Sequence, residues 1–393
     1  MRQRVVQIFH AGLAGVNGGK RVAAYLKAHP LEGEVHAVAI GKAAPAMMEG
    51  AFGCLGERIA RALVITKEGC GRPLPRTLCL EAGHPLPDRR SLEAGQKLLA
   101  FLEAAPSRAR LLFLISGGAS ALVECLPRGM DLERLQSVQR WLLASGMDIH
   151  RINAVRKRLS LIKGGKLIPY LKGRPTLNLL ISDVPGDAPA TIGSGLLVPS
   201  REPLPELPPG LGRLPLIPPP EEEAPFVHTE ILATYRDAQA AAAKAARLKG
   251  YRVRLHPSLV TGEAEAEGRR LARDLLEDPS HVHIWSGETT VRLPSHPGMG
   301  GRCQHLALAA SLVMEGYPCV LLAAGTDGTD GPTPFAGAVV DGGTVKRGRE
   351  RGLDPRACLR AADAGRFLAA TGDILVTGPT GTNVMDMMIG MGR

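Results

Sequence analysis

Charged and hydroxyl side chains stand next to glycine where nearly every short apolar run of this sequence ends. In the first half, this pattern occurs at Gly41-Lys42, at residues 116–120 (Ser-Gly-Gly-Ala-Ser) and at residues 182–187 (Ser-Asp-Val-Pro-Gly-Asp). In the second half, it occurs at residues 286–290, 325–331 and 378–383. Open α/β sheets bind ligands outside the carboxyl ends of their strands. We therefore expect a ligand-binding edge in each half of the chain.

Two cations occupy positions that suit an anionic ligand. Lys42 follows an apolar run, Val35 to Ile40, so its ammonium group would emerge at the end of a buried strand. Such a lysine either stabilises phosphate or a transition state, or is an ordinary surface residue. Arg302 follows Gly298-Met299-Gly300-Gly301 and precedes an apolar helix pattern. Its guanidinium group can grip a carboxylate or a phosphoryl group with two parallel hydrogen bonds.

Glycine-rich loops add backbone donors for phosphate oxygens, although a tight turn is the simpler explanation of each loop taken singly. Four carboxylates lie in such loops, namely Asp183, Asp187, Asp327 and Asp330. We expect about half of them to cap helices or stabilise turns. The others could hold Mg²⁺ with phosphate oxygens or accept the proton of an attacking hydroxyl group.

Several common catalytic motifs do not occur in this sequence. It contains no GxxxxGK[ST], no GxGxxG, no GxSxG and no HExxH. This argues against a P-loop enzyme, a dehydrogenase with the usual dinucleotide fingerprint, a nucleophile-elbow hydrolase and a zincin. The residues alone indicate an α/β enzyme that binds anions.

The elements that must position these residues alternate between strand-like and helix-like patterns. Helical spacing occurs at residues 92–102, 303–315 and 228–249. The expected strands are residues 35–40, 62–66, 111–115, 177–181, 251–255, 282–285, 319–323 and 374–377. This alternation predicts two Rossmann-like α/β domains with mainly parallel sheets.

The chain is long enough for two hydrophobic cores, because its 393 residues exceed the size at which one core stops growing. A proline-rich segment at about residues 199–225 has neither helical nor alternating periodicity. We therefore expect an N-terminal domain over residues 1–222 and a C-terminal domain over residues 226–393.

Composition narrows the class of protein. The net charge of +10 is spread along the chain and aromatic residues make up only 4%, so we expect no nucleic-acid partner. No apolar run approaches the length that crosses a bilayer, so we also expect no membrane association. Seven scattered cysteines without a CxxC pair indicate a reducing, cytoplasmic compartment. The four asparagines and many prolines are typical of thermophilic proteins.

The loops also resemble, in order along the chain, those of the glycerate 2-kinase family, whose C-terminal half carries the MOFRL motifs. In the first half the matching segments are residues 41–44, 83–88, 116–122, 153–157, 162–165 and 182–187. In the second half they are residues 287–291, 300–304, 327–333, 336–339 and 377–383, with Asp386. Similar sequences are often labelled as hydroxypyruvate reductases.

The resemblance implies two domains facing each other across a cleft, and phosphorylation of D-glycerate by ATP with Mg²⁺, usually at O2. It implies catalytic roles for Lys42, Asp183 and Arg302, to which we add Asp187, and it leaves open which aspartate is the base. Among the loop carboxylates, Asp327 and Asp330 are our candidate metal ligands. The candidate nucleotide contacts are Ser116, Gly117, Gly118, Ser120, Gly287, Glu288, Thr380, Gly381 and Asn383.

The sequence departs from the family pattern at several positions, one of which is Leu196-Leu197-Val198 in place of the usual Pro-Thr after Gly193-Ser194-Gly195. Ala119 stands in place of a third glycine, and Cys303 and His305 replace the usual Asn and Glu after Arg302. Ala119 still permits a helix start. Cys303 and His305 either alter the substrate choice or the position of phosphorylation, or are merely changes on a helix face. Two other functions stay open, a hydroxypyruvate reductase that uses NAD(P)H and a catalytically silent small-molecule sensor. A homodimer is one assembly that the sequence allows.

Overall fold

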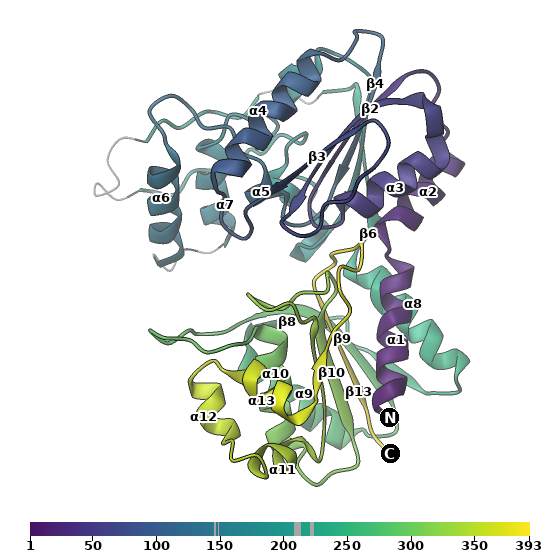
Figure 1. The fold of residues 1–393 in the computed structure, drawn as a ribbon, viewed down its shortest axis with the longest axis vertical. Helices are drawn as coiled ribbons and strands as arrows, with labels where there is room; N and C mark the ends of the chain where they lie inside the picture. The colour runs from purple at the N-terminus through teal and green to yellow at the C-terminus, as the bar shows by residue number, and fades with distance from the viewer. Residues whose placement is uncertain (145–146, 148, 208–213, 221–223) are drawn as a thin grey trace. The chain divides into compact units, whose positions relative to one another are not determined.

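The computed structural model describes residues 1–144, 147, 149–207, 214–220 and 224–393. The chain forms two compact units (Figure 1). We call Gly18–Leu232 the parallel unit, and Met1–Asn17 together with Ala233–Arg393 the mixed unit, after their sheets. Part of the proline-rich segment, residues 208–213 and 221–223, lies outside the described residues.

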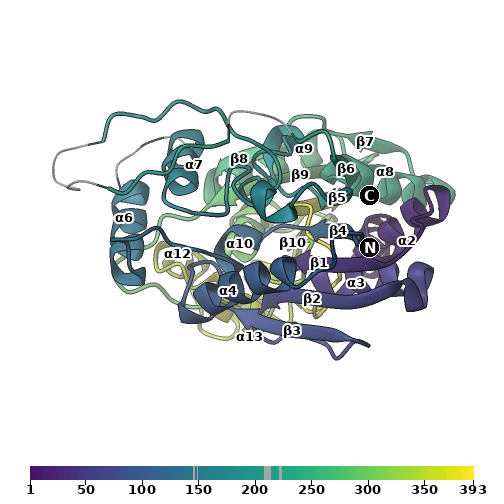
Figure 2. The same ribbon diagram turned by 90° about the horizontal axis from the view of Figure 1, so that it is seen from above.

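The parallel unit is built on a six-stranded sheet with the order β3-β2-β1-β4-β5-β6. Its central strands β2, β1, β4 and β5, and the outer strand β3, pair in parallel, as expected from the alternating pattern. Strand β1 is buried along its whole length, because helices cover both faces of the sheet. Figure 2 shows β1, β2 and β3 side by side. The strands are β1 (Val35–Ile40), β2 (Ile59–Lys67), β3 (Thr77–Ala82), β4 (Arg110–Ile115), β5 (Thr176–Ile181) and β6 (Val227–Ala233).

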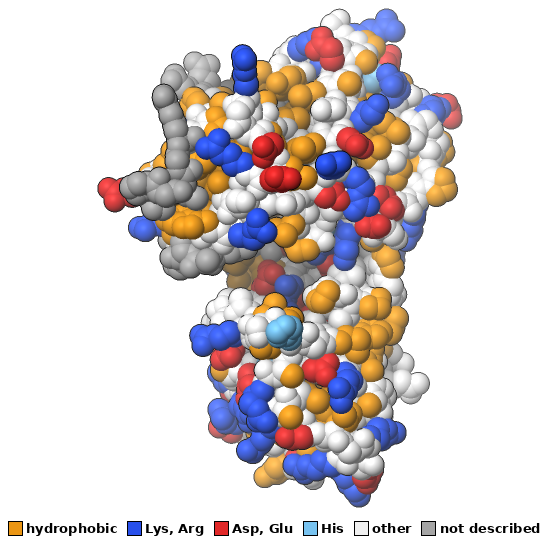
Figure 3. Space-filling view, turned by 60° about the vertical axis from the view of Figure 1, so that its left-hand side comes forward, with side chains coloured by type: hydrophobic (Ala, Val, Ile, Leu, Met, Phe, Trp, Pro, Cys, Tyr) orange, Lys and Arg blue, Asp and Glu red, His pale blue; other side chains and the backbone are white. Residues whose placement is uncertain are grey.

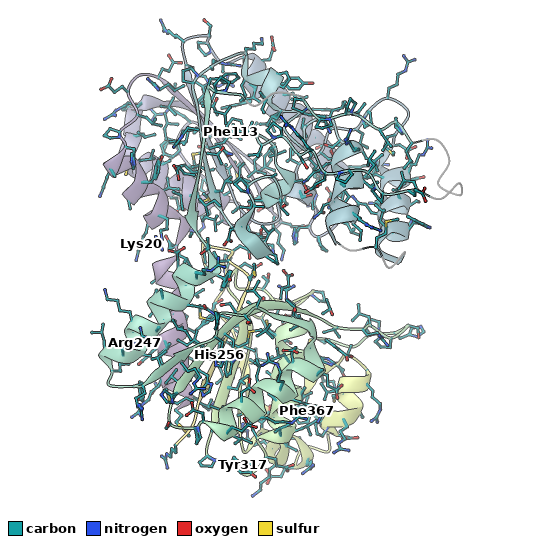
Figure 4. The ribbon with its side chains drawn as sticks, turned by 180° about the vertical axis from the view of Figure 1, so that it is seen from behind. Lys20, Phe113, Arg247, His256, Tyr317 and Phe367 are labelled. Atoms are coloured by element: carbon teal, nitrogen blue, oxygen red, sulfur yellow. The ribbon has the colours of Figure 1, made fainter. Side chains whose placement is uncertain are left out.

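Helices α2 and α3 lie on one face of this sheet and α4 lies on the other (Figure 1). An N-terminal capping box starts α4, since the Asp88 carboxylate accepts from the Ser91 N–H and the Ser91 hydroxyl accepts from the Asp88 N–H. Phe113 of β4 lies in the core between α4 and the sheet (Figure 4). The helices are α2 (Gly18–Ala28), α3 (Ala44–Leu55), α4 (Arg89–Glu103), α5 (Ala119–Leu122), α6 (Leu132–Ala144) and α7 (Ile149–Arg158).

The mixed unit contains a seven-stranded sheet that differs from the mainly parallel sheet expected. Strands β9, β13, β10, β11 and β12 pair antiparallel along this order, whereas β7 and β8 pair with β9 in parallel. The expectation was wrong because strand pairing depends on which strands meet, and β13 inserts between β9 and β10 in the opposite direction. The strands are β7 (Val253–Leu255), β8 (Val260–Glu263), β9 (Val282–Thr290), β10 (Val320–Gly325), β11 (Gly337–Asp341), β12 (Ile374–Leu375) and β13 (Asp386–Met391).

Helices again cover both faces of the mixed sheet, with α1 and α8 on one face and α9 and α10 on the other (Figure 1). Phe367 of α13 lies in the core on the α10 side (Figure 4). The helices are α1 (Arg2–Gly15), α8 (Tyr235–Leu248), α9 (Ala264–Glu277), α10 (Arg302–Val313), α11 (Thr344–Arg349), α12 (Pro355–Arg360) and α13 (Ala364–Thr371).

Residues 1–17, which we expected in the first domain, belong to the mixed unit because α1 packs closely on α8. Small side chains allow this approach: a Cβ atom at Gly15 would lie 2.4 Å from Cβ of Ala241, and one at Gly12 would lie 3.3 Å from Cβ of Ala242. The helix pattern noted at residues 228–249 is also divided in two. Residues 227–233 form β6, and α8 begins only after Thr234, whose hydroxyl caps the helix.

Surface charge is distributed rather than concentrated. On the face drawn in Figure 3, Lys and Arg side chains are interspersed with Asp and Glu side chains. Among the described helices, none combines the length and the apolar character that a membrane crossing requires.

Candidate functional site

In the parallel unit, three candidate segments follow neighbouring strands at the same edge of the sheet. Gly41-Lys42 follows β1, Ser116 follows β4 and Ser182-Asp183 follows β5. Strand β4 lies between β1 and β5 and pairs with both in parallel. The carboxyl ends of these strands therefore bring the three segments to one edge.

Hydrogen bonds hold the first two segments together. The Ser116 hydroxyl accepts from the Ala43 N–H at 3.1 Å, and the Lys42 N–H donates to the Gly117 carbonyl at 2.9 Å. Gly41 has φ +129°, and a Cβ atom there would lie 2.2 Å from Oγ of Ser116. Only glycine tolerates this contact and this backbone conformation. The buried Ser116 hydroxyl thus has a structural role in fixing the backbone around Lys42.

Gly118 and Ser120, in the loop at residues 116–120, have different neighbours. A Cβ atom at Gly118 would lie 3.2 Å from Cγ of Lys42 and 3.1 Å from Cδ2 of His84, so these residues adjoin the glycine backbone. The Ser120 hydroxyl instead lies 2.7 Å from the Ser194 hydroxyl and accepts from the Arg156 guanidinium at 3.3 Å. Burial lowers the pKa of Arg156. The helix that follows the loop, α5, has only four residues, so the helix start expected there is short.

His84 is a residue that the sequence analysis did not single out. It follows β3, at the same edge of the sheet as Lys42, and it borders Gly118. Its motif, Gly83-His84-Pro85, was one of the segments that carry the family resemblance.

Asp187, one of the candidate bases, lies in a short 3-10 turn, Pro185–Asp187, with its backbone at φ +54°.

In the mixed unit, Arg302 is held by two carboxylates. Its Nε and Nη2 donate to the two carboxylate oxygens of Asp386 at 2.6 and 2.9 Å, and Nη1 lies 2.8 Å from Oε1 of Glu288. Asp386 is 1% exposed, whereas Glu288 has 47% of its side chain exposed. Burial alone would lower the pKa of Arg302, but the charge and hydrogen bonds of Asp386, with the charge of Glu288, raise it. The guanidinium group is therefore a fixed cation.

Strand pairing explains how these three residues meet. Asp386 is the first residue of β13 and lies opposite Gly287 of β9 in the antiparallel ladder. Arg302 is the first residue of α10. Gly287 and Glu288 were expected in a loop after a strand ending at Trp285, but β9 continues to Thr290 through its pairing with β8 and β13. Glu288 is thus a strand residue beside Arg302.

Asp330 and Asp327, the two candidate metal ligands, both accept backbone hydrogen bonds. The carboxylate oxygens of Asp330 accept from the N–H groups of Cys303 and Gln304 at 3.0 and 2.8 Å, which caps α10. Burial raises the pKa of Asp330 to about 6, and these backbone hydrogen bonds oppose that shift. Oδ1 of Asp327 accepts from the N–H and the hydroxyl of Thr329.

The loop at residues 378–383 is tied to the loop that follows β10. The Thr380 hydroxyl donates to the Thr326 carbonyl at 2.5 Å, and the Val384 N–H donates to the Thr326 hydroxyl at 2.8 Å. Thr382 and Asn383 are buried.

The structure brings the candidate residues together in two sets. One set is Lys42, His84 and Gly118 in the parallel unit, and the other is Arg302, Glu288 and Asp386 in the mixed unit.

Comparison with known proteins agrees with this architecture. Residues 4–206 match the domain of unknown function DUF4147, and residues 281–386 match the MOFRL family. The chain is 35% identical to a glycerate 2-kinase from Pyrococcus horikoshii, over 92% of this chain and 88% of that protein. It is 36% identical to a D-glycerate 2-kinase from Thermotoga maritima, over 90% and 89% of the two chains.

A solved structure, that of a glycerate kinase from Thermotoga maritima, superposes on the whole of this chain and on 99% of the other, with a TM-score of 0.86 at 33% identity. Together, the fold and the matches define a two-part α/β protein with a DUF4147 region followed by a MOFRL region. The chain belongs to the glycerate 2-kinase family.

Proposed function

We propose that this protein transfers the γ-phosphoryl group of ATP to the O2 hydroxyl of D-glycerate, which yields 2-phosphoglycerate and ADP. The observation that carries this proposal is the identity of 35% to a glycerate 2-kinase over 92% of the chain. The retention of Lys42, Asp183 and Arg302 within motifs that resemble those of the family supports it.

Lys42 would stabilise the transferring phosphoryl group. Phosphoryl transfer spreads negative charge over the equatorial oxygens of the phosphorus, so a positioned ammonium group lowers the barrier. The backbone around Lys42 is fixed by the Ser116 hydroxyl and by the Gly117 carbonyl. A cation that is already in place needs little reorganisation during the reaction. Ser116, Gly117, Gly118 and Ser120 stay our candidates for phosphate contacts in this unit.

Arg302 would grip the carboxylate of glycerate or a phosphoryl group. Asp386 occupies Nε and Nη2, whereas Nη1 faces the half-exposed Glu288. Displacing the buried Asp386 would leave a carboxylate unpaired in a dry site, which costs far more than displacing a solvated one. An anionic substrate would therefore compete with Glu288 for Nη1, and Asp386 would hold the guanidinium plane in place.

The acceptor proton would pass to a carboxylate. As the O2 oxygen forms its bond to the γ-phosphorus, the bond from that phosphorus to the leaving ADP oxygen breaks, and Asp183 or Asp187 takes the hydroxyl proton. Lys42 and the two aspartates belong to the parallel unit, and Arg302 belongs to the mixed unit.

Mg²⁺ would neutralise charge on the ATP phosphates. The described residues hold no cluster of three or more His, Cys, Asp or Glu side chains that could hold a metal ion alone. Mg²⁺ commonly needs only one or two carboxylates besides substrate phosphates, so Asp327 or Asp330 fits that requirement. Gly287, Glu288, Thr380, Gly381 and Asn383 stay our candidates for contacts to the nucleotide.

One experiment tests the proposal directly. The protein is incubated with Mg-ATP and D-glycerate, and phosphorus NMR identifies the phosphoglycerate isomer. Appearance of 2-phosphoglycerate is expected, the 3-isomer would correct the position of transfer, and no product would refute the kinase. A parallel absorbance assay with NADH and hydroxypyruvate tests the reductase alternative, for which we expect no NADH consumption.

A further inference from the structure

A pocket of about 360 Å³ lies in the mixed unit beside the start of α10. It is bordered by the end of β9, by the glycine-rich loop 298–301 and by the turn before α13. Most of its wall is apolar and comes from Val291, Leu293, Pro297, Pro332, Ala362 and Ala364. Arg302 lines the same pocket. The pocket therefore has a mainly apolar lining with the fixed guanidinium group of Arg302 in its wall.

Hydrogen bonds shape the wall of this pocket. The Met299 N–H donates to Oδ1 of Asp363 at 2.9 Å, and the Gly365 N–H donates to the Met299 carbonyl at 2.8 Å. A Cβ atom at Gly298 would lie 2.4 Å from Cβ of Asp363, so the loop packs tightly on the turn before α13. A wall tied at several points is preformed, which reduces the entropic cost of binding a ligand.

Thr289 supplies the observation that points to a ligand. Its side chain lines the pocket and is 2% exposed. Among the described residues, its buried hydroxyl has no hydrogen-bond partner. A buried hydroxyl without a partner costs free energy, so such groups are usually satisfied by a ligand or by water. A polar group of a ligand in the pocket would restore that hydrogen bond.

His305 adds a second polar group on the same wall. It lies on α10, is 6% exposed and lines the pocket. Burial lowers the pKa of His305, so its imidazole is neutral near pH 7 and can both donate and accept a hydrogen bond. A neutral ring suits an uncharged heteroaromatic partner.

We propose that this pocket binds the nucleoside end of ATP, with the base against the apolar wall, within reach of Thr289 and His305, and the phosphates toward Arg302. The proposal rests on the phosphoryl-transfer function proposed above. The volume of the pocket lies within the range of about 300–1,000 Å³ that is typical of small-molecule sites. Glycerate carries oxygen on each of its three carbons and would leave the apolar wall without a partner, whereas a nucleobase would cover it.

Binding of a fluorescent N-methylanthraniloyl ADP to the full-length protein tests this site without turnover. Val291→Trp should fill the pocket and weaken binding of the analogue more than tenfold. Thr289→Val keeps the shape and removes the hydroxyl, so we expect binding roughly three- to tenfold weaker. Leu248→Trp, at the exposed end of α8, is the matched control for a new tryptophan and should bind as the wild type does.

Competition experiments distinguish a nucleoside site from a glycerate site. Adenosine should displace the analogue from the wild-type protein, and D-glycerate should not. Displacement by D-glycerate alone would assign the pocket to the acceptor and overturn the proposal. Wild-type affinity in both folded pocket variants, checked by circular dichroism, would also overturn it. If Val291→Trp does not fold, Thr289→Val decides the matter.

The same samples separate this inference from the proposed function. Phosphorus NMR reports 2-phosphoglycerate formation by the wild-type protein. If it forms while both variants bind the analogue normally, the kinase stands and the pocket assignment fails. If the analogue binds in a way that depends on Thr289 but no phosphoglycerate forms, the pocket stands and the kinase fails.

Discussion

The two units gather their candidate residues by different means. In the parallel unit, Lys42, Ser116 and Asp183 each follow a strand, and neighbouring parallel strands end at one edge. In the mixed unit, Glu288 lies within a strand, Asp386 begins a strand and Arg302 begins a helix. An antiparallel strand enters the edge at which its neighbours leave it. A site in a mixed sheet therefore draws on strand beginnings as well as strand ends.

The units also differ in how they bury charge. In the parallel unit, Lys163 and Glu124 form an ion pair in which both side chains are 2% exposed. In the mixed unit, Arg302 keeps 34% of its side chain exposed while its partner Asp386 is buried. The first pair belongs to the interior, whereas the second presents a cation to a pocket. We expect substitutions to affect stability in the first case and both stability and activity in the second.

The largest expected effect concerns the candidate cation of each unit. Lys42→Ala and Arg302→Ala should each lower kcat by about 10²–10³-fold or more, because each removes a positioned cation from the transition state. The rate of 2-phosphoglycerate formation measures this. Arg247→Ala, at the exposed end of α8 (Figure 4), is the control and should keep normal turnover. Near-normal turnover in either variant would show that the substituted cation does not contribute to catalysis.

Next in size is the interior pair of the parallel unit. Glu124→Gln should lower the free energy of unfolding by about 3–5 kcal/mol, because Lys163 would be left as a buried cation without its counter-charge. Burial already lowers the pKa of Lys163, which shows that the site disfavours an uncompensated charge. Urea unfolding measures the change. The double variant Glu124→Gln, Lys163→Met should recover much of the loss, and its failure to do so would contradict the explanation.

A smaller effect should distinguish the two carboxylates that pair with Arg302, those of Asp386 and Glu288. Asp386→Asn should lower the free energy of unfolding by about 2–3 kcal/mol, since the arginine is only partly buried. It should also reduce kcat/KM for D-glycerate by about tenfold or more through misplacement of the guanidinium group. Glu288→Gln should change stability by less than about 1 kcal/mol, as half-exposed pairs do. Equal effects of the two substitutions would refute the distinct roles.

The smallest expected effect concerns acid stability of the mixed unit. His256, labelled in Figure 4, stacks on Trp285 with ring centroids 4.6 Å apart, and its Nε2 lies 3.1 Å from Nδ1 of His283. Burial, and then the neighbouring His283, lowers the pKa of His256 to about 4. A depressed folded-state pKa stabilises the protein above the unfolded value near 6.5, and this contribution is lost as the pH falls toward 4.

Acid titration of the free energy of unfolding measures this loss, which should be about 1 kcal/mol after solvent screening. The chain has two tryptophans, so Trp285 alone reports on the mixed unit in a Trp141→Phe background. His256→Phe should flatten the slope between pH 6.5 and 4 while retaining the stacked ring. An unchanged slope would show that other groups dominate the acid response.

Local patterns in the sequence predicted much of the parallel unit. The run Val35 to Ile40 is β1 with the same bounds, and Leu111 to Ile115 lies within β4. Strands β3 and β6 of that unit were missed. In the mixed unit, β8, β11 and β13 were missed and β9 was ended too early. These strands hold glycine or methionine among their apolar residues, so neither alternation nor β-branched composition marks them.

The candidate site shows the same division. Lys42 and Arg302 could be selected from residue type and from their place beside glycine, because strand ends and helix starts are encoded locally. Asp386 could be noticed only as part of a motif, because its partner Arg302 is 84 residues away in the sequence. Asp330 was selected from the sequence as a candidate metal ligand, and only the fold could add that its carboxylate caps α10.

The sequence by itself determined the α/β class, the candidate loops and the family, since these follow from local periodicity and from ordered motifs. Only the tertiary structure decided the direction of each strand in the mixed sheet, the placement of α1 with α8 and the carboxylates that hold Arg302. These features depend on contacts between residues far apart in the chain, whose free energy appears only when distant segments pack together.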